Sequence, residues 1–209
     1  AIPQWLVLLT FSATSLTFVI NANDGTVLKA PILIVLSSVI AALWFARMVA
    51  DHKFHISLSS VQIAFIGYGA ISAVSLSRAI NLRLGLEEMA QLICLFIILS
   101  SSASLQKSER AMKTVFLVVN CVTALACLVG LAQIIPGVTS GRIFISNERQ
   151  AISTFGNTTY FAGYLVVILP IVVSQIFLKP ARTYRLMLLS LLAVLIVFLL
   201  IQTESRSGW

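Results

Sequence analysis

The chain alternates between long apolar runs and short polar segments. Charge-free windows of about 17 residues or more, the length that carries an α-helix across a bilayer, recur along it. The pattern predicts about seven membrane-spanning helices, at residues 2–20, 30–45, 56–77, 89–104, 114–135, 160–178 and 185–202. The expected fold class is all-α, a polytopic transmembrane helical bundle that forms a single domain over residues 1–209.

The first apolar run has a second interpretation, as a signal peptide. Ser12-Ala13-Thr14 is rich in small residues, as a cleavage region would be. No basic segment precedes the run, and Trp5 suits a membrane–water interface. We therefore expect a retained span.

Two features inside the runs affect helix shape and packing. Pro170 removes a backbone hydrogen bond in the sixth run and frees the carbonyl of Val166, which predicts a bend. Gly69, Ala73 and Ser77 are spaced four residues apart and predict a ridge of small side chains for close helix packing.

Composition agrees with a membrane protein. The chain is 59% hydrophobic and 10% charged, and its mean hydropathy is +1.01, values that no soluble domain of 209 residues would show. The net charge of +7 does not indicate nucleic acid as a partner, because the basic residues lie in short segments between the spans, where they set topology.

The distribution of basic residues predicts an orientation. With the connections numbered from one to seven, the even ones hold 8 basic residues: Arg47, Lys53, Lys107, Arg110, Lys113, Lys179, Arg182 and Arg185. The odd ones hold 6: Lys29, Arg78, Arg83, Arg142, Arg149 and Arg206. Basic residues favour the cytoplasmic side, so the N-terminus is expected inside and the odd connections outside.

The histidines and cysteines do not predict a metal site. His52 and His55 lie with Asp51 in a short basic loop, where solvated side chains are favoured over metal ligands. The cysteines all fall within apolar runs, where we expect small packing residues rather than disulfides or ligands: Cys94, Cys121 and Cys127.

The segment at residues 153–164, Ser-Thr-Phe-Gly-Asn-Thr-Thr-Tyr-Phe-Ala-Gly-Tyr, predicts a polar turn that leads into a helix. Gly156 and Asn157 supply turn chemistry, and Thr158 or Thr159 can cap the helix that follows. The aromatic residues of the segment are expected at a membrane–water boundary: Phe155, Tyr160, Phe161 and Tyr164.

A second segment, Thr-Glu-Ser-Arg-Ser-Gly-Trp at residues 203–209, puts Arg206 just past the end of the next apolar run. Together the two segments resemble the O-antigen ligase and polymerase family of bacterial membrane glycosyltransferases. In that family a T-F-G-N-x-x-x-x-A-G-Y-L helix start and an S-R-[SG]-[GA]-W helix end lie one hairpin apart. Most relatives have proline where this chain has Thr158. The motif match covers about residues 150–209, and the upstream resemblance is one of hydropathy and spacing.

The resemblance implies an enzyme of the cell inner membrane that works on its outer, periplasmic face. Such enzymes transfer a glycan from an undecaprenyl pyrophosphate carrier to an acceptor sugar hydroxyl in lipopolysaccharide or polysaccharide biosynthesis. Ligases use a lipid A–core acceptor, polymerases use a growing glycan, and related transferases use a protein hydroxyl. The scheme implies contacts with membrane lipids and needs no metal, cofactor or nucleic acid. The sequence likewise has no Gly-rich phosphate loop, no H-E-x-x-H and no paired-cysteine site.

The candidate substrate-binding residues are the arginines of the odd connections together with Asn157. A guanidinium grips phosphate oxygens with two parallel hydrogen bonds, which suits a pyrophosphate at headgroup level. The set is Arg206, Arg149, Arg142, Arg78, Arg83 and Asn157.

The arginines also have a structural interpretation, in which each extends to the interface or pairs with a glutamate. That interpretation is favoured for Arg78, Arg83 and Arg142 taken singly. For Arg206 the functional one is favoured, because Ser205, Ser207 and Gly208 flank it at the most recognisable position of the family motif. An ion pair between Arg206 and Glu204, two residues apart, would need a non-helical backbone.

The catalytic base is not predicted. The family places a base, usually a histidine, in a large outer loop that has no counterpart here. We therefore expect these residues to be the N-terminal part of a longer protein. The alternatives are a transporter of a small or lipid-linked solute and a structural membrane scaffold. The spans carry no internal charge, which disfavours transport and leaves the scaffold open.

Overall fold

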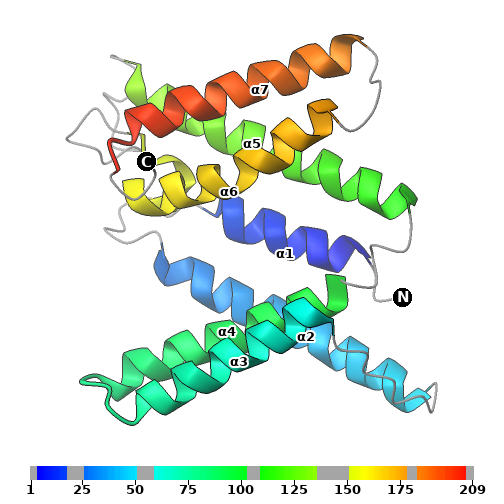
Figure 1. Cartoon of the computed structure of the whole chain (residues 1–209), viewed down its shortest axis with the longest axis vertical. Helices are drawn as coiled ribbons and strands as arrows, with labels where there is room; N and C mark the ends of the chain where they lie inside the picture. Colours follow the sequence, from blue (N-terminus) through cyan, green and yellow to red (C-terminus); the bar gives the residue numbers. More distant parts are fainter. Residues whose placement is uncertain are drawn as a thin grey trace. The chain divides into compact units, whose positions relative to one another are not determined.

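The computed structural model describes residues 4–17, 26–50, 59–102, 109–135, 151–177 and 183–205, and these residues form helices and connecting turns without any strand. The helices are α1 (Gln4–Leu16), α2 (Thr26–Ala50), α3 (Ser60–Leu76), α4 (Leu82–Ser102), α5 (Glu109–Ile134), α6 (Thr158–Phe177) and α7 (Thr183–Gln202), with a short 3-10 helix, η3 (Ser153–Phe155), before α6 (Figure 1). The predicted all-α class is confirmed, and each predicted span overlaps one α-helix.

Four of the described helices are long and apolar enough to cross a membrane: α5, α6, α7 and the Lys29–Ala46 part of α2. Trp5–Leu16 in α1 and Ser60–Leu76 in α3 are shorter apolar helices. The fourth helix begins earlier than its predicted span, at Leu82, so Arg83, Glu87 and Glu88 lie in its first two turns rather than in a connection. The chain therefore has the helices of a multi-pass membrane protein.

The chain divides into two compact units. The N-terminal unit comprises Ala1–Thr14 and Ala30–Val115, and the C-terminal unit comprises Ser15–Lys29 and Phe116–Trp209. Both units are helical throughout their described parts. The prediction of a single domain stays a prediction.

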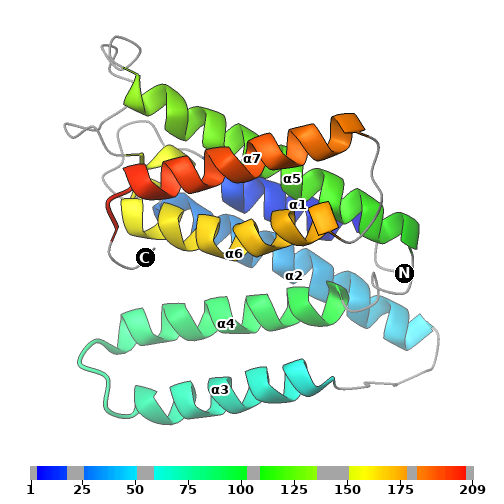
Figure 2. The ribbon, with the colours of Figure 1, turned by 45° about the horizontal axis from the view of Figure 1, so that its top comes forward.

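The N-terminal unit contains the α3–α4 hairpin (Figure 2). A capping box starts α3: the Ser59 hydroxyl accepts a hydrogen bond from the Gln62 N–H, and the Gln62 side chain accepts one from the Ser59 N–H. The Gln62 amide nitrogen also donates to the Ser100 hydroxyl of α4 at 3.0 Å. Hydrogen bonds between polar side chains help to hold helices together in a membrane. The hydrophobic effect contributes little there, because lipid tails are as apolar as the helix faces.

The core of the same unit lies between α1, α2 and α4. It contains Leu6 and Ile40, with partly buried neighbours around them: Val7, Trp44, Ile97 and Ile98. The predicted small-residue ridge of α3 is wrong at Gly69, because a Cβ placed there would meet nothing within 4 Å. No neighbouring helix in the described part of the chain therefore lies close to Gly69.

The C-terminal unit contains the α6–α7 hairpin, whose helices run antiparallel (Figures 1 and 2). The buried positions of α6 recur every three or four residues along one face: Phe161, Ala162, Leu165, Ile168, Val172 and Gln175. Gln175 exchanges two hydrogen bonds with Asn120 of α5, at 2.9 and 3.2 Å. Helix α6 continues through Pro170, and the bend expected there stays a prediction. The start of α6 and the end of α7 lie at the same end of the hairpin.

Candidate functional site

The segment before α6 has an unusual backbone, which local sequence explains in part. Residues Ser153–Phe155 form η3, and Gly156 follows in the left-handed region with φ of 70° and ψ of −3°. Glycine adopts this conformation without the steric cost that a Cβ brings. The predicted polar turn leading into a helix is confirmed.

Asn157, rather than either threonine, caps α6. Its side-chain oxygen accepts a hydrogen bond from the Thr159 N–H at 2.8 Å, and its carbonyl accepts from the Phe161 N–H at 3.1 Å. The helix already starts at Thr158, so the predicted cap at Thr158 or Thr159 is wrong by one or two residues. Asn157 is exposed, and its cap uses only the side-chain oxygen. Within the part of the chain that the structure describes, its amide nitrogen has no hydrogen-bond partner.

Ser153 has positive φ, 49°, which is strained for a residue with a Cβ. Gln133 near the end of α5 holds it there. The Gln133 side-chain oxygen accepts from the N–H groups of Ser153 at 2.7 Å and Ile152 at 3.2 Å, and its nitrogen donates to the Ser153 carbonyl at 3.2 Å. The Ser153 hydroxyl also donates to the Ala126 carbonyl at 2.6 Å. Sequence reasoning missed Gln133, although a glutamine inside an apolar run was a visible signal.

Two more contacts fix the turn to other helices of the C-terminal unit. The buried Thr154 hydroxyl donates to the carbonyl of Ser15 in α1 at 2.6 Å. A Cβ added to Gly130 of α5 would lie 3.2 Å from the Phe161 ring and 3.5 Å from Ser153 Cβ. The turn is therefore built against α5 and against Ser15, the end of α1 that belongs to the C-terminal unit, as well as against its own helix.

The aromatic residues of the segment form a cluster instead of a uniform interfacial belt. Phe155 stacks on Phe161 with ring centroids 5.6 Å apart and lies 4.8 Å from the Tyr164 ring. Phe161 is fully buried and belongs to the packed core, so it faces protein and is not an exposed interfacial ring, and its predicted level at the membrane–water boundary stays a prediction. The Tyr164 hydroxyl shares a hydrogen bond of 2.8 Å with Thr123 of α5. Tyr160, by contrast, is 54% exposed, consistent with the prediction for it.

Lys29, in the first turn of α2, lies against this cluster. Its Nζ is 3.8 Å from the centroid of the Phe155 ring, a cation–π contact. The Nζ atom is enclosed, and no residue of the chain's described part accepts a hydrogen bond from it. Sequence analysis counted Lys29 only as a topological charge.

The end of α7 supplies the other half of the candidate site. Thr203 and Ser205 are buried, and the Thr203 hydroxyl donates to the Leu200 carbonyl at 2.7 Å. Glu204 between them has φ of 50°, so the backbone leaves the helix before Arg206. The non-helical backbone that an ion pair between Glu204 and Arg206 would need is therefore present at Glu204, while Arg206 itself lies outside the described residues.

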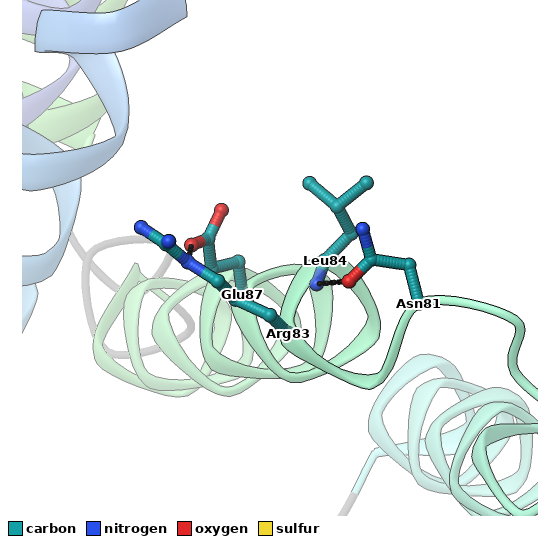
Figure 3. A network of polar contacts seen from close by, with 4 residues as sticks. All are labelled: Asn81, Arg83, Leu84 and Glu87. Atoms are coloured by element: carbon teal, nitrogen blue, oxygen red, sulfur yellow. Dashed lines mark hydrogen bonds and ion pairs between the residues drawn. The ribbon is translucent and has the colours of Figure 1, made fainter.

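The other predicted arginines divide into two groups. Arg142 and Arg149, like Arg206, lie outside the described residues. Arg78 and Arg83 belong to the N-terminal unit, Arg78 exposed in the turn after α3 and Arg83 in α4. Figure 3 shows Arg83 turned toward Glu87, with 3.2 Å between Nε and Oε1. The two side chains are 88% and 55% exposed, so this pair is well screened and the structural interpretation of Arg83 is supported.

Metal-ligating groups are scarce in what the structure describes. In those ranges no three residues among His, Cys, Asp and Glu lie close enough together to hold an ion, and His52 and His55 fall outside them. Cys94 and Cys127 are buried and free, whereas Cys121 is exposed on α5, so its predicted packing role is wrong. Around the turn, the donors without a hydrogen-bond partner among the described residues include the exposed Asn157 amide nitrogen and the enclosed Lys29 ammonium.

Comparison of the chain with protein-family models, curated proteins and solved structures finds no match.

Proposed function

We propose that this chain belongs to a membrane glycosyltransferase of the O-antigen ligase type, which moves a glycan from an undecaprenyl pyrophosphate carrier to an acceptor hydroxyl. One observation carries the proposal. The two segments that resemble this family, the turn ending at Asn157 and the sequence around Ser205, flank the same end of the α6–α7 hairpin. Arg206 is the next residue after Ser205 in the sequence.

The construction of the turn supports a binding role over a mere connection. A plain helix-to-helix connection does not need a strained serine, a buried glutamine that binds the backbone on both sides and a buried threonine bond to α1. Such over-determined backbone is typical of sites where a few polar groups must keep fixed positions. Asn157, exposed and fixed by its cap, is the group that this arrangement presents.

The proposed reaction follows from the chemistry of the donor. The acceptor oxygen forms a bond to the anomeric carbon of the glycan, and the bond between that carbon and the pyrophosphate oxygen breaks. The lipid pyrophosphate leaves with the electron pair, and a base takes the acceptor proton. Arg206 would offset the charge that develops on the leaving pyrophosphate, with Arg142 and Arg149 as further candidates. The base is not assigned to any residue of this chain.

The proposed location is the periplasmic face of the bacterial inner membrane, with the N-terminus in the cytoplasm. The distribution of basic residues between the connections supports this orientation. Single cysteines introduced between residues 142 and 153, in a variant without the native cysteines, should react with a membrane-impermeant thiol reagent in intact cells. Reaction only after lysis would reverse the orientation and remove the basis for an external site.

The function itself is tested by transfer in proteoliposomes. The protein, with any sequence that follows Trp209, is supplied with an undecaprenyl pyrophosphate-linked glycan and separately with lipid A–core, a free glycan or an unfolded peptide as acceptor. We expect glycan to move to one acceptor with release of undecaprenyl pyrophosphate. The acceptor used distinguishes ligase, polymerase and protein transferase. Movement of the intact lipid-linked donor between leaflets without transfer would instead support the transporter.

A further inference from the structure

The ammonium of Lys29 has an unusual environment for a lysine. Its Nζ is enclosed, yet within the ranges that the structure describes it has neither a hydrogen-bond acceptor nor a carboxylate partner. An ammonium carries three N–H donors, and a cation removed from water is costly unless it is paired and hydrogen-bonded. The environment of Lys29 is therefore incomplete.

The only compensation among the described residues is the face of Phe155, 3.8 Å away. Phe155 is itself fixed, because its ring packs on Phe161 and Tyr164 of α6 and its backbone lies in η3. A ring face attracts a cation electrostatically, but it does not supply hydrogen-bond acceptors for the three N–H donors of the ammonium. Phe155 therefore sets the position of the ammonium without satisfying it.

An anion with several oxygen acceptors would complete this environment, because it supplies both a counter-charge and hydrogen-bond acceptors. Lys29 is in the first turn of α2, at the start of the helix's membrane-spanning part, Lys29–Ala46. The end of such a span is the level at which the phosphate groups of lipids lie. Phosphate oxygens supply negative charge and several acceptors together, and lysine binds them as a compact point charge.

We propose that Lys29, positioned by Phe155, binds the phosphate group of a lipid ligand. The inference rests on the proposed function where it names the lipid pyrophosphate of the glycan donor as that ligand. It adds to that function a cation from α2, held against the same turn that presents Asn157. An anionic phospholipid offers the same chemistry, and the experiment separates the two sources.

The experiment measures binding to the purified protein in neutral detergent by intrinsic fluorescence or a shift in thermal midpoint. The probes are farnesyl pyrophosphate, farnesol as the phosphate-free control, and short-chain phosphatidylglycerol. The variants are Lys29→Met, Lys29→Gln and Lys29→Arg. Lys113→Met is the matched control, because Lys113 is an exposed lysine paired with Glu109 at 3.3 Å at the start of α5.

We expect farnesyl pyrophosphate to bind and farnesol not to bind. Lys29→Met should weaken binding at least about tenfold, the scale of losing one charge-assisted hydrogen bond. Lys29→Arg should retain most of the affinity, and Lys113→Met should change nothing. Without ligand, Lys29→Met should have a thermal midpoint equal to or above that of the wild type, because it removes an unpaired enclosed charge.

Equal affinity of Lys29→Met and wild type for every phosphate probe, or no binding of any probe to the wild type, would overturn the inference. So would failure of both neutral variants to accumulate while Lys29→Arg accumulates, since Lys29 would then be structural. Lys29-dependent binding of phosphatidylglycerol alone would support the phosphate site and assign it to a headgroup. Lys29-dependent binding of farnesyl pyrophosphate in a protein without transfer activity would retain this inference and reject the proposed function.

Discussion

Gln133 of α5 binds the backbone of Ser153 on both sides: its side-chain oxygen accepts from the Ser153 N–H at 2.7 Å, and its side-chain nitrogen donates to the Ser153 carbonyl at 3.2 Å. The two residues are 20 positions apart in the chain. The contact joins the end of α5 to the start of the turn that precedes α6. It holds in place a serine with φ of 49°. The turn therefore depends on α5 for a backbone that its own sequence does not favour.

Replacing Gln133 by leucine tests this dependence. The change leaves backbone groups of Ile152 and Ser153 without partners in a buried place, so we expect a loss of roughly 2 to 4 kcal/mol in the free energy of unfolding. Unfolding in mixed micelles, followed by circular dichroism, measures it. Gln91→Leu in α4 is the control, because the described residues give the Gln91 side chain no hydrogen bond. Equal effects of the two substitutions would contradict the proposed clamp.

Asn157 allows the cap and a ligand contact to be separated. Asn157→Ala should cost about 1 kcal/mol of stability through loss of the cap to the Thr159 N–H. Asn157→Asp keeps a capping oxygen and replaces the exposed amide nitrogen, so its stability should stay near that of the wild type. If the amide nitrogen contacts the substrate, Asn157→Asp should still lose transfer activity. Normal activity in a stable Asn157→Asp protein would leave Asn157 with the cap alone.

The two helical glycines at positions 130 and 163 form a matched pair. A Cβ at Gly130 would meet the ring of the fully buried Phe161 at 3.2 Å, whereas a Cβ at Gly163 would meet nothing within 4 Å. Gly130→Ala should therefore destabilise the protein by about 1 kcal/mol or more. Gly163→Ala should be neutral or gain up to about 1 kcal/mol, since alanine is the better helix former. Thermal unfolding compares them, and a gain in both would show that Phe161 does not need Gly130.

Arg206 is the decisive residue for the proposed chemistry. Arg206→Ala should lower glycan transfer about a hundredfold or more, the scale for losing a donor that stabilises developing charge. Arg206→Lys should restore activity only partly, because an ammonium keeps the charge and loses the paired hydrogen bonds of the guanidinium. The measurement is transfer in proteoliposomes, normalised to folded protein. Full activity in the alanine variant would remove Arg206 from the site, and loss of the protein itself would make its role structural.

The helices and the turn before α6 could be predicted because their signals are local. An apolar run of sufficient length must satisfy its backbone hydrogen bonds internally in a membrane, so it forms a helix whatever surrounds it. Glycine at position 156 likewise signals a left-handed residue, and its φ of 70° agrees. The cap is Asn157 and not a threonine because α6 already begins at Thr158, and the sequence pattern alone did not fix that boundary to one residue.

What surrounds each helix was decided only by the tertiary structure. In a soluble protein an apolar side chain is expected in the interior. In a bilayer a leucine or phenylalanine side chain can face either lipid or protein, because both are apolar. Hydropathy therefore did not separate buried Phe161 from exposed Tyr160, nor show that Gly130 is crowded and Gly163 is not. Thr154 bonds to Ser15 across 139 positions, and Lys29 meets Phe155 from a different helix. The sequence by itself determined where the helices lie along the chain. Which residues surround the turn was decided by a few long-range polar and aromatic contacts, and no local sequence pattern encodes such contacts.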